Sequence, residues 1–362
     1  MDGLVDGIDI NIPKNIIFKS IPTNGAAMTS LPLPSSTGAT ATVQPFYDSR
    51  TGTVSYVVWD HATRQAAVID PVLDYDPDAG RTHDASARLL LDYLQAERLG
   101  VEWILETHAH ADHLSAARRI QAAAGGKVAI GAAIRTVQRT FGPLFGMEPA
   151  QDDGFDHLFE DGETFRIGAT GAQAIGVPGH TPADMAYRID GAVFVGDTLF
   201  LPDVGTARTD FPGGDAAALY RSIQRLLDLP GDTRMFVCHD YPPEGRAPAC
   251  ETTVEAQRRN NIHVGRQAGE RAFVALRQAR DATLAVPRLL LPSIQVNVRG
   301  GRLPEPGPEG IAYLRIPLNV FGRADALPDA TSASQALAAC DGSTAAAAWQ
   351  LSYPRSGRVP TA

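Results

Sequence analysis

The sequence predicts an α/β protein over residues 43–319 of the 362-residue chain. Two patterns support this prediction. Short runs rich in β-branched and aromatic residues, such as 54–59, are bounded by turn residues and are typical of strands. Amphipathic stretches lie between them, as in 216–229, where Leu219, Ile223 and Leu226 recur at helical spacing. Strands and helices therefore alternate along this part of the chain.

The N-terminal half begins with three short strands separated by turn residues, which favours a meander. An amphipathic stretch follows, and a strand then runs directly into a cluster of histidines. The elements predicted for this half are strands at 43–47, 54–59, 66–69, 101–107 and 127–130, and helices at 85–99 and 114–124.

The second half repeats this alternation and ends in helices. Its predicted strands lie at 165–167, 172–177, 186–189, 192–195 and 235–238, and its predicted helices at 216–229, 253–261 and 269–281. A Pro/Gly-rich segment around residues 300–310 closes the unit.

Composition divides the chain into four parts. Residues 1–42 contain no secretory signal, and we expect a poorly ordered extension in which Met28 is an alternative start. Residues 43–240 form the main domain, and the helical and Pro/Gly-rich residues 241–321 are expected to pack on it. The tail at 322–362 is rich in Ala and Ser and is predicted to be of low complexity.

Charge and cysteine usage exclude several classes of protein. The chain has 32 Lys and Arg against 41 Asp and Glu, a net charge of −9, which argues against a nucleic-acid-binding surface. No apolar run reaches the length of about 18 residues that a membrane-spanning helix needs. The three cysteines form no CxxC pair, which favours a reducing compartment, so we expect a cytoplasmic protein. The sequence does not define the oligomeric state, and a homodimer is the commonest assembly.

The motif HxHxDH is the strongest chemical signal in the chain. His108, His110, Asp112 and His113 follow the predicted strand at 101–107 directly. Alternate residues of an extended segment point the same way, so the first three can converge, and the turn that follows can bring in the fourth. Imidazole nitrogens and carboxylate oxygens suit Zn or Fe. A polar loop without a metal is the alternative, and this spacing favours the metal site over it.

Three later residues share the same context. His180, Asp197 and His239 each follow a predicted apolar strand, at the strand ends where α/β sites collect. A residue of this kind, taken alone, is more often a buried structural or capping residue than a ligand. Together with HxHxDH they form a set of seven candidate ligands.

The order HxHxDH, His, Asp, His resembles the metal framework of the metallo-β-lactamase superfamily. The resemblance implies an αββα sandwich, in which two mixed β-sheets are flanked by helices and the metal site lies at one edge. Three segments resemble the persulfide dioxygenases (sulfur dioxygenases) of that superfamily, namely 106–115 (ETHAHADHLS), 196–215 with GTARTDF at 205–211, and 238–241. The stretches 295–300 and 310–319 are similar to the bacterial β-lactamase-like hydrolases of sulfide-responsive operons. One departure is Ala183, where many members have Gly.

In persulfide dioxygenases a single Fe(II) is held by the residues that match His108, His180 and Asp197. The resemblance therefore implies that these three residues are catalytic, and that His110, Asp112, His113 and His239 surround them and orient ligands and water. It also implies the substrates, glutathione persulfide or a related low-molecular-weight persulfide together with O2, and the products sulfite and glutathione.

Two other functions stay open. A dinuclear zinc hydrolase of glyoxalase II type would use all seven residues, with Asp197 bridging two Zn ions and acting on a glutathione thioester or lactone. The helices after His239 are short and unlike the glutathione-binding domain of glyoxalase II, which counts against this alternative. A metal-bearing sensor or binding protein on the same fold is the third hypothesis, and the intact ligand set disfavours it.

Two residues are candidates for substrate binding. Arg208 is suited to clamp the carboxylate of an anionic substrate, and a structural salt bridge with Asp210 or Asp203 is an equally weighted alternative. Tyr241, two residues after His239, could donate to substrate, and a packed aromatic rim is the favoured alternative. Cys238 lies in an apolar strand and is assigned no role.

Overall fold

The computed structural model describes residues 28–31, 41–147 and 154–322. Most of the predicted extension at 1–42 and the predicted tail beyond Gly322 lie outside these ranges. None of the described helices is long and apolar enough to cross a membrane.

The first sheet is mixed. Antiparallel pairs join its first four strands, and parallel pairs join the rest. Met28–Ser30 is an edge strand of this sheet and pairs with the next strand. The prediction that residues 1–42 are poorly ordered is therefore wrong for these three residues. In spatial order, the strands in the described part of the chain are β1 (Met28–Ser30), β2 (Ala41–Asp48), β3 (Thr53–Asp60), β4 (Gln65–Ile69), β7 (Gly100–Leu105), β9 (Lys127–Gly131) and β10 (His157–Phe159).

The second sheet is also mixed, since β14 and β15 are parallel and its other neighbours are antiparallel. Its described strands are β11 (Thr164–Ile167), β12 (Thr170–Gly176), β13 (Met185–Ile189), β14 (Ala192–Phe194), β15 (Arg234–Phe236) and β16 (Glu251–Thr253). A small third sheet, which the sequence did not predict, contains β6 (Arg81–His83), β5 (Val72–Asp76) and β8 (Leu114–Ser115).

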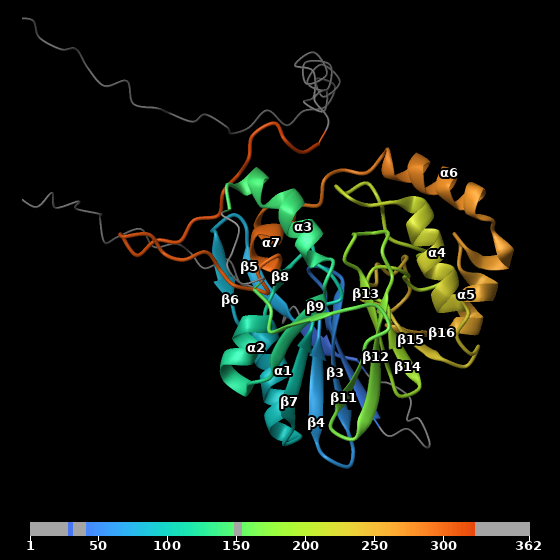
Figure 1. The fold of residues 1–362 in the computed structure, drawn as a ribbon, viewed down its shortest axis with the longest axis horizontal. Helices are drawn as coiled ribbons and strands as arrows, with labels where there is room; N and C mark the ends of the chain where they lie inside the picture. The colour runs from blue at the N-terminus through green and yellow to red at the C-terminus, as the bar shows by residue number, and fades with distance from the viewer. Residues whose placement is uncertain (1–27, 32–40, 148–153, 323–362) are drawn as a thin grey trace, which may run out of the picture. The chain divides into compact units, whose positions relative to one another are not determined.

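Helices cover the outer face of each sheet (Figure 1). Apolar side chains of α1 and α2 pack with those of the first sheet, and those of α4 and α6 pack with the second. The described α-helices are α1 (Ala85–Ala96), α2 (Ala117–Ala124), α3 (Ile134–Phe141), α4 (Ala216–Leu227), α5 (Val254–Asn260), α6 (Glu270–Asp281) and α7 (Leu290–Asn297). Short 3-10 helices lie at Pro143–Phe145 and Gly265–Gln267.

The central core lies between the two sheets, and strand alternation explains it. In β3, Val54, Tyr56 and Val58 face the second sheet, whereas Val57 faces the helices. Tyr187 and Phe194 of the second sheet complete the same core. The expected αββα sandwich of two mixed sheets flanked by helices is therefore confirmed.

Asp60, at the end of β3, ties the first sheet to the second. Its carboxylate accepts hydrogen bonds from Ala169 N at 3.0 Å and from Thr170 Oγ1 at 3.0 Å, in the turn between β11 and β12. The hydroxyl of Thr63 also donates to this carboxylate. This bond has the largest effect and the bonds from Ala169 and Thr170 add to it, so that the pKa of Asp60 is lowered to about 2.

The opposite edge of the sandwich holds the strand ends that carry the candidate ligands. β12, β14 and β15 run in the same direction, so their carboxyl ends meet at one edge of the second sheet. The backbone links this edge to the first sheet, because Val54 N donates to the Cys238 carbonyl at 2.6 Å and Met185 N to the Thr107 carbonyl at 2.9 Å. Ligands from both sheets can therefore face one another.

Candidate metal centre

The structure brings all seven predicted ligands together at this edge. The first sheet supplies His108, His110, Asp112 and His113 from the loop after β7. The second sheet supplies the other three from the loops after β12, β14 and β15. The histidines are all buried, with at most 4% of each residue exposed.

One cluster consists of His108, His180 and Asp197, whose potential ligand atoms lie within 4.8 Å of one another. Asp197 Oδ2 lies 3.9 Å from His108 Nε2 and 3.6 Å from His180 Nε2. His108 Nε2 and Asp197 Oδ1 are buried without a hydrogen-bond partner among the described residues. Buried polar atoms without a partner are costly, so two imidazoles and a carboxylate aimed at one point fit a metal ion.

The remaining ligands form a second cluster beside the first. Asp112 Oδ2 lies 3.3 Å from His113 Nδ1 and 3.4 Å from His239 Nε2. His239 Nε2 also lies 3.4 Å from Asp197 Oδ1, so Asp197 touches both clusters. The Nε2 atoms of His113 and His239 are buried without a hydrogen-bond partner in the described part of the chain. The chemistry of these atoms suits a second metal ion or a bound water.

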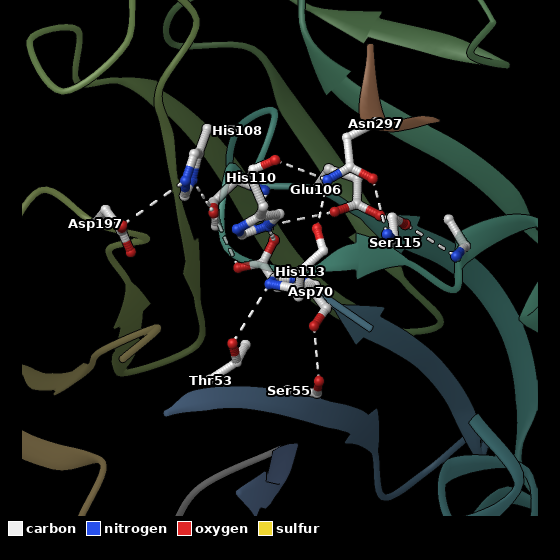
Figure 2. A network of polar contacts seen from close by, with 12 residues as sticks. Thr53, Ser55, Asp70, Glu106, His108, His110, His113, Ser115, Asp197 and Asn297 are labelled. Carbon is white, nitrogen blue, oxygen red and sulfur yellow. Dashed lines mark hydrogen bonds and ion pairs between the residues drawn. The ribbon is translucent and has the colours of Figure 1, made fainter. Parts of the chain in front are cut away.

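His110 differs from the other histidines because two buried carboxylates hold it (Figure 2). Its Nε2 lies 3.0 Å from Asp70 Oδ1 and 3.5 Å from Glu106 Oε2. Burial alone would lower the pKa of His110, but Asp70 and then Glu106 outweigh it and raise the pKa well above its usual value. The Nδ1 atom of His110 has no hydrogen-bond partner among the described residues, and its ring centroid lies 4.0 Å from that of His108.

Asp70 and Glu106 are functional-site residues that the sequence analysis missed. Asp70 follows β4 in the same way that the ligands follow their strands, which is the signal that could have found it. Its oxygens also accept Thr107 N at 2.7 Å and Thr107 Oγ1 at 2.9 Å. Asp70 therefore fixes the residue that immediately precedes the histidine motif.

The metallo-beta-lactamase superfamily model matches residues 49–239, which include every one of these ligands. That match covers more than half of the chain. The chain belongs to the metallo-beta-lactamase superfamily. With the buried histidine–aspartate clusters, this family membership indicates a metal-dependent enzyme.

Similar proteins divide between two chemistries. A probable metallo-hydrolase of Burkholderia pseudomallei is 51% identical and covers 77% of this chain and 100% of its own length. Glyoxylase B2 of Dictyostelium discoideum is 44% identical over 77% of this chain and 97% of its own length. The mitochondrial persulfide dioxygenase ETHE1 of Homo sapiens is 29% identical over 56% of this chain and 70% of its own length. Among solved structures, ETHE1 of Myxococcus xanthus matches with a TM-score of 0.59 and 27% identity, over 72% of this chain and all of that chain.

In this superfamily member the Nδ1 atoms of His108 and His180 also have polar contacts. His180 Nδ1 donates to the Arg208 carbonyl at 2.7 Å, which leaves Nε2 with a lone pair for a metal. His108 Nδ1 lies 3.0 Å from Thr107 Oγ1. Burial, and then the neighbouring His110 and His180, lower the pKa of His108 well below its usual value, which favours the neutral imidazole that binds metals.

The two candidate substrate-binding residues have different surroundings. Arg208 makes a two-point ion pair with Asp210, at 2.6 and 2.7 Å, and donates to the Ala285 carbonyl at 2.7 Å. These contacts match the salt bridge that was the alternative to a substrate clamp. Tyr241 is 50% exposed, and its ring stacks on that of His239, with 5.6 Å between centroids. Tyr241 therefore borders both the metal centre and solvent.

Proposed function

We propose that this protein is a non-haem iron persulfide dioxygenase that oxidises glutathione persulfide in sulfide detoxification. In this proposal one Fe(II) per chain is held by His108, His180 and Asp197. The observation that carries it is the convergence of two imidazoles and one carboxylate within 4.8 Å, the ligand set typical of non-haem Fe(II) oxygenases. Similarity to the human persulfide dioxygenase and to a solved ETHE1 structure supports the same chemistry.

The reaction converts glutathione persulfide, O2 and water to glutathione, sulfite and two protons. The S–S bond breaks, the two sulfurs together lose four electrons, and O2 accepts them. His108, His180 and Asp197 would hold the iron through three protein ligands only, so that the bound ion could supply the redox chemistry with positions open to O2 and substrate.

The chain itself contributes orientation and exclusion of water. Its ligands are buried, and the hydrogen bond from His180 to the Arg208 carbonyl fixes the direction of one imidazole. We assign Tyr241 to the substrate side, because half of it is exposed next to His239. Arg208 stays in the proposal as the clamp for a substrate carboxylate, which would have to compete with Asp210.

A dinuclear zinc hydrolase of glyoxalase II type is the second candidate. The Nε2 atoms of His113 and His239 have no hydrogen-bond partner among the described residues, and His239 Nε2 lies 3.4 Å from both Asp112 Oδ2 and Asp197 Oδ1. These atoms favour the hydrolase, because they could hold a second ion with Asp197 as the bridge. The similarity to glyoxylase B2 points the same way. Its substrate would be a glutathione thioester or a lactone.

The proposal includes a cytoplasmic location, a possible homodimer and small-molecule partners only. Glutathione is the expected thiol carrier of the persulfide sulfur. Another low-molecular-weight persulfide would be oxidised by the same iron chemistry.

Oxygen consumption with glutathione persulfide tests the proposed function. We expect uptake by the wild-type protein and its loss in His108→Ala and Asp197→Ala. His157→Ala is the matched control, because His157 pairs with Glu163 at 2.7 Å away from the ligand clusters and should retain full uptake. Unchanged uptake in His108→Ala would refute the assigned site, and wild-type protein without uptake but with thioester hydrolysis would favour the hydrolase.

A further inference from the structure

Asn297 is the last residue of α7 and lies outside the residues that the family model matches. It is nevertheless buried against the loop that carries the histidine motif, with 3% of the residue exposed (Figure 2). The sequence analysis predicted neither α7 nor a role for this side chain.

The amide of Asn297 uses both of its N–H donors and its oxygen on this loop. Its Nδ2 donates to the carbonyls of His110 and His113, both at 2.8 Å. Its Oδ1 accepts Ser115 N at 2.8 Å. Two carbonyls on one side and an N–H on the other fix the orientation of the amide.

These bonds span the segment that presents Asp112 and two of the histidines. Ser115 Oγ in turn donates to Glu106, the carboxylate that lies 3.5 Å from His110 Nε2. The backbone of the loop and the side chain of His110 are therefore held through a common residue, Ser115. A carboxylate at position 297 would place oxygen against two carbonyl oxygens and would break both bonds.

We propose that Asn297 is a positioning residue of the metal centre. Its side-chain amide fixes the backbone of residues 110–115, so that His110, Asp112 and His113 face the metal. This inference rests on metal binding by the site and not on persulfide oxidation. In the zinc hydrolase the positioned side chains would themselves be ligands, and in the iron enzyme they would surround the ion and orient its ligands and water.

Gln295 provides a matched control on the same helix. It is also buried, its Nε2 donates to the Leu291 and Arg315 carbonyls at 2.7 and 2.9 Å, and its Oε1 accepts Arg315 N at 2.9 Å. Gln295 therefore has the same bonding pattern as Asn297, but it holds the backbone of Arg315 and not the loop that carries the histidine motif. Gln295→Glu therefore reproduces the chemical change of Asn297→Asp away from the site.

The test uses Co(II) as the probe, added to metal-free full-length protein with a competing chelator. We expect Asn297→Asp to weaken Co(II) binding by about 10- to 100-fold and to change the visible absorption of the bound ion. Gln295→Glu should keep wild-type affinity and spectrum, whatever it does to the urea midpoint. Asn297→Ala, which adds no charge, should weaken binding in the same direction.

The proposal is overturned if Asn297→Asp and Asn297→Ala bind Co(II) with wild-type affinity and spectrum. It is also overturned if Gln295→Glu weakens binding by the same factor, because α7 would then act only through overall stability. Neither readout uses oxygen or persulfide, so a failure of the proposed reaction leaves this test intact.

Discussion

Substitution of Asp70 by Asn changes one charge next to the metal centre and leaves the shape of the side chain intact. The oxygen of the new amide can still accept Thr107 N and His110 Nε2, which lie 2.7 and 3.0 Å from Asp70 Oδ1. Its NH2 group would face Thr107 Oγ1, 2.9 Å from Asp70 Oδ2. The heavy-atom contacts can therefore survive while the charge and the direction of one hydrogen bond change.

Two effects follow from this change. Removing one partner of a buried ion pair lowers the free energy of unfolding by about 3–5 kcal/mol. We expect a loss of about 3 kcal/mol for Asp70→Asn, because Glu106 still lies 3.5 Å from His110 Nε2. In the native site the Thr107 hydroxyl donates to Asp70 and so accepts from His108 Nδ1, 3.0 Å away. With an amide donating to it, the hydroxyl turns its proton to His108 and favours the tautomer with a proton on Nε2, which opposes metal binding. We expect metal affinity to fall by about 10- to 100-fold.

Asp74→Asn is the control for this prediction. Asp74 is also buried and accepts the backbone N–H and hydroxyl of one residue, Ser86, at 2.8 and 2.9 Å. Chelator competition for metal affinity and urea titration of the metal-free protein are measured for both variants. Asp74→Asn should lose stability and keep its metal affinity. Wild-type metal affinity in Asp70→Asn, or an equal loss of affinity in Asp70→Asn and Asp74→Asn, would contradict this prediction.

Three further predictions concern other parts of the structure. The folded pKa of Asp60, about 2, lies below its usual 3.8, so its contribution to stability is present above pH 4 and lost as the pH falls through 2. The difference in unfolding free energy between wild type and Asp60→Asn should therefore shrink by about 1 kcal/mol between pH 7 and pH 3 in urea titrations, and a constant difference would contradict the assignment. Burial raises the pKa of Cys238 well above its usual value and that of Cys250 to about 12, so mass spectrometry should find neither alkylated by iodoacetamide in the native protein. If Arg208 clamps substrate, Arg208→Lys should raise the KM for persulfide. Asp210→Asn should lower that KM, because it frees the guanidinium of Arg208. Equal changes in Tm for the two variants, with no change in KM, would show that the ion pair is purely structural.

Strands, helices and candidate ligands could be predicted from the sequence where a local pattern of residues identifies them. Predicted strands such as 54–59 and helices such as 216–229 correspond to β3 and α4, because their apolar side chains alternate with the period of the element. The seven ligands could be listed because each follows an apolar strand. Their convergence depends on the packing of two sheets, and the resemblance to a known family supplied that step.

The parts that could not be predicted depend on contacts between distant segments. Asp70 lies 37 residues from its partner Thr107, and its place after a strand marks it as a candidate without showing which residue it contacts. Asn297 lies 187 residues from His110, in a helix that is buried on most of its faces and so gives little amphipathic pattern. The edge strand β1 has three residues, too few for a periodic pattern, and is defined by its pairing with β2 and the burial of Met28.

In the proposed function, one iron ion at His108, His180 and Asp197 supports persulfide oxidation. The most direct measurement combines metal analysis of anaerobically purified protein with the ratio of sulfite formed to O2 consumed on glutathione persulfide. The proposal predicts one Fe per chain and one sulfite per O2. Two Zn per chain, with no oxygen consumption by the iron-reconstituted protein, would contradict it.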